Sequence, residues 1–176
     1  MFTAERIREL FALLNDELRN KGVRGEVYLA GGAVMCLAFH AREATKDVDA
    51  LLVPAADLRR AAKEIAEQEG LPDNWLNDSV KGFFSEHGRF EVFEELSNLR
   101  LYVPHPGYLL AMKCLALRLG EEFQDLDDVR TLVGMLGLRT VAEAEAILGQ
   151  YYAAERFPAR ARYVLEELLG NSELPG

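Results

Sequence analysis

The strongest chemical signal in this 176-residue chain is a pair of short motifs in its first third. Gly31 and Gly32 follow one apolar segment, and Asp47 and Asp49 open the next. Side chains alternate across a strand, so the two aspartates are predicted to share one face. Two neighbouring carboxylates repel each other unless a cation lies beside them. Mg²⁺ prefers oxygen ligands and commonly binds one or two carboxylates plus substrate phosphates, so the pair predicts a metal site.

The glycine pair predicts the other half of such a site. A helix that begins after a tight glycine turn presents free backbone N–H groups and the positive end of its dipole to an anion. Thr45 and Lys46 precede the aspartates and could add a hydroxyl and a positive charge. The glycine pair alone is equally typical of an ordinary turn. The Asp-x-Asp motif alone is equally typical of a solvated strand edge. Their occurrence together, with a short spacer, predicts a metal–triphosphate site.

The elements that must position these residues follow from hydrophobic periodicity and from glycine and proline punctuation. In the first half, the pattern predicts a helix at 3–20, a strand at 26–30, a helix beginning at the two glycines, a strand at 47–53 and a helix from Pro54 to Gly70. In the second half, it predicts a turn-rich, weakly helical segment at 71–84, β-rich segments at 89–96 and 99–103, and helices at 107–120, 126–136, 140–153 and 158–169. The expected fold is α+β, a small mixed sheet flanked by helices, with a helical C-terminal third. We expect a single domain over 1–176, with an α/β core at 25–105 and a helical part at 106–176.

Composition excludes several classes of protein. The formal net charge is −9, whereas a protein that coats nucleic acid is basic because it must neutralise phosphates. The charge favours a small anionic substrate held by a few cations, or an RNA contacted at one end. No apolar segment reaches the roughly 18 residues of a membrane span, and the charged N-terminal segment lacks the apolar core of a signal peptide. We therefore expect a cytoplasmic protein without a membrane partner, in which Cys36 and Cys114 are buried thiols.

The motifs together resemble a known family. The glycine pair, a helix and Asp47-Val48-Asp49 followed by apolar residues resemble the signature of the polymerase-beta-like nucleotidyltransferase superfamily. The segment 109-LLAMKCLALRLGEEFQDLDDVRTL-132 is similar to minimal nucleotidyltransferases related to the toxins of AbiE-type and Men-type toxin–antitoxin systems. The segment 73-DNWLND-78 also resembles a subgroup of small members. The resemblance spans roughly residues 25–135 and implies a nucleotidyltransferase core.

The resemblance implies an activity and a set of roles. Gly31 and Gly32 would contact the triphosphate of an NTP, and Asp47 and Asp49 would bind Mg²⁺, which activates an acceptor hydroxyl. An NMP would pass to that hydroxyl, on a tRNA end, a protein or a small molecule, and an antitoxin protein would be a partner. Two alternatives share the core: a non-catalytic nucleotide-binding or antitoxin-like protein, and an aminoglycoside-modifying nucleotidyltransferase.

A second candidate group lies in the C-terminal half. Lys113 is the only charged residue in the run YLLAMKCLAL, and burying an unpaired ammonium is costly. It either extends to water along its own stem or meets a phosphate or a carboxylate, and the resemblance favours a nucleotide phosphate. Asp125, Asp127 and Asp128 open the next helix, where acidic residues favour the first turn. The resemblance implies that Asp125 or Asp128 acts near the nucleotide or acceptor, and we favour Asp128 because Asp125 better fits a capping role.

A third catalytic carboxylate, which fuller members of the superfamily carry on a later strand, has no distinctive match here. The candidates are Glu91 and Glu94, and both are equally consistent with solvent-facing strand residues. The toxin-like minimal enzymes also lack a clear third carboxylate on a strand, so its absence here would not exclude catalytic activity.

Two further groups could touch a nucleic acid. The cations Arg156, Arg160 and Arg162 could contact RNA phosphates or pair with Glu166 and Glu167 on one helix. The aromatic residues that could stack on a base, or simply pack in the core, are Trp75, Phe83 and Phe84.

Overall fold

The computed structural model describes residues 1–120 and 123–170, which divide into two compact units. Unit 1 comprises Met1–Gly82 and Phe90–Pro104, and unit 2 comprises Phe83–Arg89 and the chain from His105 onwards. Residues 121–122, inside the segment that resembles the toxins, lie outside the described residues. The expectation of a single domain stays a prediction.

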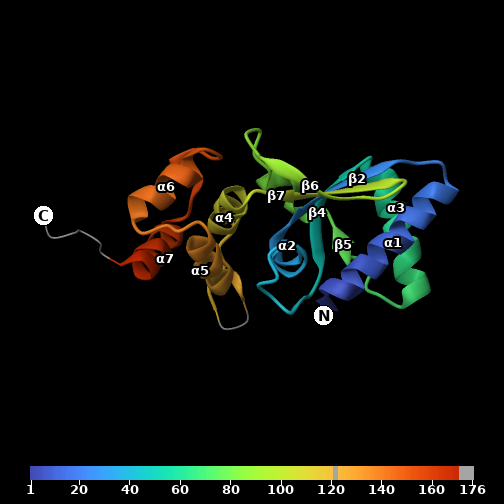
Figure 1. Ribbon diagram of the computed structural model, residues 1–176, viewed down its shortest axis with the longest axis horizontal. Helices are drawn as coiled ribbons and strands as arrows, with labels where there is room; N and C mark the ends of the chain where they lie inside the picture. The colour runs from blue at the N-terminus through green and yellow to red at the C-terminus, as the bar shows by residue number, and fades with distance from the viewer. Residues whose placement is uncertain (121–122, 171–176) are drawn as a thin grey trace, which may run out of the picture. The chain divides into compact units, whose positions relative to one another are not determined.

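A mixed sheet organises unit 1. Within the described residues it has five strands in the order β5-β4-β2-β7-β6 (Figure 1). The strands are β2 (Gly25–Ala30), β4 (Val48–Val53), β5 (Leu76–Asn77), β6 (Phe90–Glu95) and β7 (Leu99–Pro104). Strand β2 is antiparallel to β4 and parallel to β7. A second, two-stranded sheet pairs β1 (Phe2–Thr3) with β3 (Ala44–Thr45). The predicted α+β class with a small mixed sheet is confirmed.

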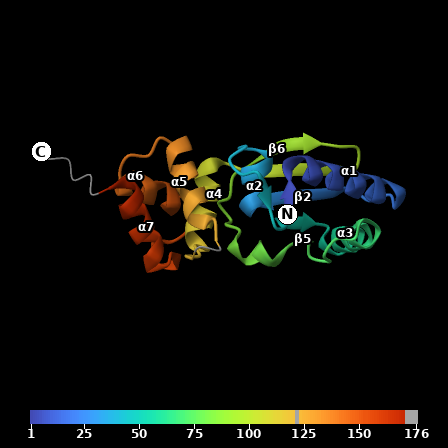
Figure 2. The same cartoon turned by 90° about the horizontal axis from the view of Figure 1, so that it is seen from below.

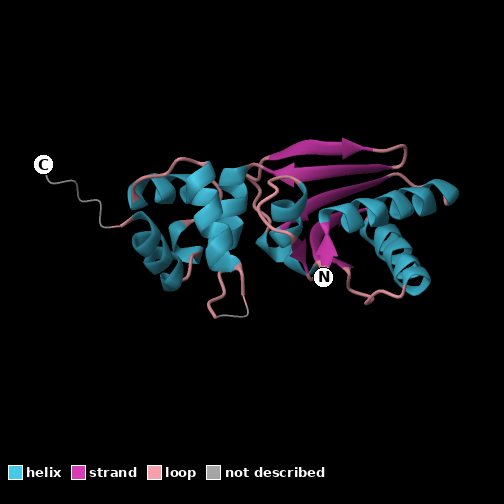
Figure 3. Ribbon diagram, turned by 60° about the horizontal axis from the view of Figure 1, so that its bottom comes forward, coloured by secondary structure: helices cyan, strands magenta, loops and turns pink. Residues whose placement is uncertain are grey.

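Helices cover one face of this sheet. They are α1 (Ala4–Asn20), α2 (Gly31–Leu37) and α3 (Ala55–Glu69), and Figures 2 and 3 show α1 and α3 on the same side of the strands. The Thr3 hydroxyl caps α1 by accepting the backbone N–H of Arg6. Helix α3 ends at Gly70, which has the left-handed backbone that glycine adopts without strain. Both ends agree with the sequence-based expectation.

The two faces of the sheet differ in burial. In β4, Val48, Ala50 and Leu52 are buried, whereas Asp49 and Leu51 between them are only half-buried. The alternation follows from the period of two along a strand, with the apolar residues facing the helices. Asp49 therefore lies on the face opposite the helices. The strand predicted at 47–53 begins at Val48, so Asp47 precedes it, and a shared face for the two aspartates stays a prediction.

Unit 2 is helical. Its helices in the described residues are α4 (Pro106–Leu115), α5 (Asp125–Met135), α6 (Val141–Gly149) and α7 (Ala159–Leu169), with a 3₁₀ turn η2 (Ala154–Arg156). Helices α4 and α6 end earlier than predicted. The backbone N–H of Arg118 donates to the Asp125 carboxylate instead of continuing α4, and Tyr151 leaves α6 to stack on Tyr108 with ring centroids 4.8 Å apart.

The segment 71–84 was predicted to be turn-rich and weakly helical. It contains the 3₁₀ turn η1 (Ser79–Phe83), but also the two-residue strand β5, which pairs with β4. So short a strand carries no periodicity that a sequence could reveal.

Among the described residues, none of the helices has the length and apolar character needed to cross a membrane.

Candidate functional site

The turn at Gly31 lies directly beside the Asp49 carboxylate in unit 1. Strands β2 and β4 pair with Ala30 opposite Asp49, and Gly31 follows Ala30. Gly31 has a backbone φ of +61°, which costs a residue with a Cβ energy. A Cβ at this position would also lie only 2.9 Å from Oδ2 of Asp49. Both the backbone conformation and the close carboxylate therefore require glycine here.

The next glycine is required by different neighbours. A Cβ added at Gly32 would overlap Nη1 of Arg42 and lie 3.1 Å from its Cζ and 2.7 Å from Oγ1 of Thr45. The turn thus has a carboxylate beside its first glycine and a guanidinium and a hydroxyl beside its second. Arg42 is a site residue that the sequence analysis missed. The signal that could have found it is the second glycine, which occupies a helical position although glycine is a poor helix former.

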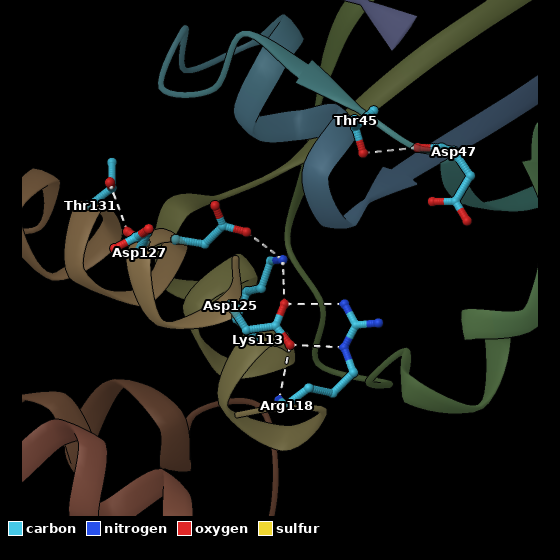
Figure 4. A network of polar contacts seen from close by, with 8 residues as sticks. Thr45, Asp47, Lys113, Arg118, Asp125, Asp127 and Thr131 are labelled. Carbon is cyan, nitrogen blue, oxygen red and sulfur yellow. Dashed lines mark hydrogen bonds and ion pairs between the residues drawn. The ribbon is translucent and has the colours of Figure 1, made fainter. Parts of the chain in front are cut away.

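The residues between Arg42 and the aspartates connect the loop to the strand. Thr45 is buried, and its hydroxyl donates to the backbone carbonyl oxygen of Asp47 at 3.2 Å (Figure 4). This bond fixes the backbone at the start of β4. Lys46, the other residue predicted to bind the nucleotide, is exposed.

Asp47 and Asp49 offer oxygen ligands for a cation. Both are half-buried, Asp49 within β4 and Asp47 just before it. Within residues 1–120 and 123–170, no group of three or more His, Cys, Asp or Glu side chains is arranged to hold a metal ion. Two carboxylates fit the donor set of Mg²⁺ only when substrate phosphates complete it. The Mg²⁺ site therefore stays a prediction, and the prediction is that Mg²⁺ binds here together with a nucleotide.

One feature weakens the anion-binding role predicted for the start of α2, and another concerns Asn77, a neighbour of Asp49. Helix α2 is only seven residues long, so the dipole at its start is small, and the glycines matter mainly for the room that they leave. Asn77 lies opposite Asp49 on β5, but its side chain is committed to the local turn: its Nδ2 donates to the carbonyl oxygen of Asn74, and its Oδ1 accepts the Ser79 hydroxyl at 2.6 Å.

Neither candidate for a third carboxylate lies on the same face of the sheet as Asp49. Glu91 is opposite Val103 and Glu94 is opposite Leu101 in the β6–β7 pairing. Residues directly opposite each other share a face, and both partners are buried on the face that the helices cover. Glu91 and Glu94 therefore lie on the other side of the sheet from Asp49.

In unit 2, Lys113 is held by two carboxylates. It is 8% exposed, and its Nζ lies 2.6 Å from Oδ2 of Asp128 and 3.3 Å from Oδ1 of Asp125. Figure 4 shows the Lys113 ammonium directed at the Asp125 carboxylate. The cost of burying the ammonium is offset by ion pairs, so the alternative of a lysine that extends to water is wrong.

Asp125 links the end of α4 to the start of α5. Its carboxylate accepts the backbone N–H of Arg118 at 2.9 Å and the Arg118 Nε at 3.0 Å. The predicted capping role of Asp125 is wrong, because Gln124 precedes the helix and no side chain caps it. Burial raises the pKa of Asp125, but hydrogen bonds from Arg118 and the charge of Lys113 outweigh burial and hold the pKa below its ordinary value.

The C-terminal cations take part in contacts within unit 2. Arg162 pairs with Glu166 at 2.9 Å, which confirms the pairing alternative for this residue. Arg160 donates to a backbone carbonyl oxygen at 2.7 Å, and the Arg156 guanidinium lies 5.1 Å from the centre of the Tyr152 ring. A contact of this cluster with RNA stays a prediction.

The remaining expectations concern apolar packing. Trp75 is fully buried, and its Nε1 donates to the Ala62 carbonyl oxygen at 2.9 Å, so it belongs to the core. Phe83 is 38% exposed and Phe84 is half-buried. Both cysteines are buried as predicted, and burial raises the pKa of the Cys114 thiol to about 12.

Comparison of the chain with protein-family models, with curated proteins and with solved structures gives no match in any of the three. The resemblance to nucleotidyltransferases therefore stays a prediction from the sequence motifs.

Proposed function

We propose that the protein is a Mg²⁺-dependent nucleotidyltransferase that transfers an NMP from an NTP to an acceptor hydroxyl. The observation that carries the proposal is the β2–β4 pairing, which brings the Asp49 carboxylate against the Gly31 turn. Asp47 lies just before β4 and is half-buried. A turn without side chains beside paired carboxylates suits a polyphosphate that approaches the backbone and shares a cation with the protein.

The reaction replaces the α–β phosphoanhydride bond of the NTP by a phosphodiester bond to the acceptor. The acceptor oxygen forms a bond to the α-phosphorus, the bond from that phosphorus to pyrophosphate breaks, and the hydroxyl proton leaves to solvent or to a nearby carboxylate. Bound Mg²⁺ would supply positive charge beside the phosphoryl oxygens. Asp47 and Asp49 would hold that cation, and Gly31 and Gly32 would leave the space in which the triphosphate lies. Thr45 would keep the start of β4 in place through its bond to the Asp47 backbone.

The other roles in the proposal come from the resemblance alone. Lys113 and Asp128 would act near the nucleotide or the acceptor, and an antitoxin protein would be a partner. Among acceptors we favour a tRNA end, as the resemblance to the toxins implies, and a net charge of −9 limits the contact with RNA to a small area. A protein hydroxyl and a small molecule are alternative outcomes of the test.

The test is transfer of label from NTPs carrying ³²P at the α-phosphate. The purified protein is incubated with Mg²⁺, each labelled NTP and total cell RNA or lysate, and both labelled products and released pyrophosphate are measured. We expect label in one acceptor class, and no transfer by Asp49→Asn, because an amide is a poor ligand for a hard cation. Asp57→Asn, on the exposed side of α3, is the matched control and should be fully active.

Three outcomes separate the alternatives. Tight NTP binding without transfer to any component would contradict catalysis and favour a nucleotide-binding protein. Transfer by Asp49→Asn equal to that of the unmodified protein would show that the site is elsewhere. Transfer to an added aminoglycoside alone would reassign the acceptor to a small molecule.

A further inference from the structure

Arg42 is a cation at the glycine turn, and the proposed reaction assigns it no role. Its guanidinium occupies the space in which a Gly32 side chain would stand, with Cζ 3.1 Å from the position of that Cβ. The Thr45 hydroxyl lies 2.7 Å from the same position, and the Asp49 carboxylate lies beside the preceding glycine. A positive group and a carboxylate therefore flank adjacent residues of one turn.

The loop that carries Arg42 is tied down on both sides. Before it, the backbone N–H of Ala41 donates to the carbonyl oxygen of Met35 at 2.8 Å. After it, Ala44 pairs with Thr3 in the small β1–β3 sheet. Arg42 therefore projects from a short stretch of backbone held at both ends. A side chain on such a support needs less ordering when a ligand binds.

We propose that Arg42 is a phosphate-binding residue of the nucleotide site, a role that rests on the proposed function. A guanidinium is always charged and presents a planar fork of donors that matches two phosphate oxygens. The absence of a side chain at Gly32 is what lets this fork lie against the turn. A nucleoside triphosphate brings more negative charge than Mg²⁺ neutralises, and Asp47 and Asp49 add to that charge. A further cation is therefore needed close to the turn, and Arg42 supplies it.

The other nearby basic residue fits this role less well. Lys46 is exposed, and its ammonium is a strongly hydrated point charge on a flexible stem. The Arg42 side chain is half-buried against the turn. The structure therefore points to Arg42 as the residue that recognises the phosphates, whichever base the nucleotide carries.

The experiment measures the affinity of Mg²⁺-ATP, Mg²⁺-GTP, Mg²⁺-CTP and Mg²⁺-UTP by calorimetry, with inorganic tripolyphosphate as a competitor that has no base. We expect Arg42→Ala to weaken binding of the preferred NTP and of tripolyphosphate by about tenfold or more, as loss of a charge-assisted hydrogen bond does. The NTP affinity of Arg42→Lys should lie between those of the unmodified protein and Arg42→Ala, because lysine keeps the charge but not the planar fork of donors. The matched control is Arg60→Ala, which removes an exposed arginine of the same unit and should bind as the unmodified protein does.

The outcomes distinguish this proposal from the function on which it rests. Unchanged NTP affinity in Arg42→Ala would overturn the role of Arg42, even if label transfer is present. Weakened NTP and tripolyphosphate binding without label transfer by the unmodified protein would support Arg42 while contradicting catalysis. An unmodified protein that binds neither NTP nor tripolyphosphate would overturn both. Melting temperatures of the variants show whether a loss of binding reflects the site or the fold, and Arg42→Lys gives the test if Arg42→Ala does not fold.

Discussion

The two pairs of aspartates in this protein have opposite environments. In unit 1, Asp47 and Asp49 are half-buried, and Asp49 lies beside a glycine turn. In unit 2, Asp125 and Asp128 are 3% and 4% exposed and share the ammonium of Lys113. Both pairs are close in sequence, and both belong to motifs that resemble parts of one family. The difference shows that spacing alone does not say which carboxylates are placed to meet a ligand.

Electrostatics explains what each environment favours. A buried carboxylate loses its hydration, so it needs a permanent cation and hydrogen bonds from the protein. Asp125 receives both, from Lys113 and Arg118. A half-buried carboxylate keeps part of its hydration and can exchange water for a metal ion at lower cost. We therefore expect substitutions in unit 2 to change stability first, and substitutions at the unit 1 turn to change nucleotide binding first.

The largest effect is expected from Lys113→Met. This variant removes the ammonium that two buried carboxylates share, and breaking a buried ion pair from one side costs about 3–5 kcal/mol. Urea unfolding should show a loss of that order in the free energy of unfolding. If Lys113 were an isolated buried lysine, the same substitution would leave stability unchanged or raise it.

Arg130→Met is the matched control for Lys113→Met. Arg130 also pairs with an aspartate in unit 2, Asp127, but both side chains are well exposed. Exposed pairs contribute only about 0–1 kcal/mol, so this variant should unfold almost as the unmodified protein does. Equal losses in the two variants would contradict the contrast between buried and exposed pairs.

A smaller effect is expected from Gly31→Ala in unit 1. The left-handed backbone at this position costs a residue with a Cβ roughly 1–2 kcal/mol. Gly22 has a similar φ of +67°, but a Cβ there would meet nothing within 4 Å. Gly22→Ala therefore measures the backbone cost alone.

The two glycine variants should differ in function more than in stability. The new methyl group of Gly31→Ala would displace Asp49, so NTP affinity should fall in Gly31→Ala and remain normal in Gly22→Ala. Calorimetry measures the affinities, and urea unfolding measures the stabilities. Normal NTP affinity in Gly31→Ala would contradict the assignment of this turn to the nucleotide.

The smallest effect is expected on acidification. Asp125 has a lower pKa in the folded protein than its ordinary value of 3.8, so the unfolded chain takes up its proton at a higher pH than the folded one. The contribution of Asp125 to stability is therefore complete above the ordinary pKa and is lost as the pH falls through the folded pKa. Melting temperatures of the unmodified protein and of Asp125→Asn should converge as the pH is lowered through this range. A difference that stays constant with pH would show that the charge of Asp125 does not matter.

Much of the fold follows from local patterns in the sequence. Apolar spacing predicted α1 and α5, Gly70 predicted the end of α3, and the period of two predicted that Asp49 lies on the opposite face from Val48 and Ala50. These features depend on residues within one or two turns of each other, so the sequence contains the whole cause. The position of the glycine turn before α2 also follows from neighbouring residues in the sequence.

The identity of the neighbours was decided by the tertiary structure. Arg42 meets Gly32 through a loop contact, and Lys113 meets Asp128 because α4 packs on α5. Glu91 and Glu94 lie on the other face from Asp49 because of the way β6 pairs with β7. Periodicity tells which side of an element is apolar, but the partner of a side chain depends on register and packing between elements far apart in the chain. The sequence by itself therefore determined most of the elements and their apolar faces, and the fold determined which side chains lie beside the glycine turn.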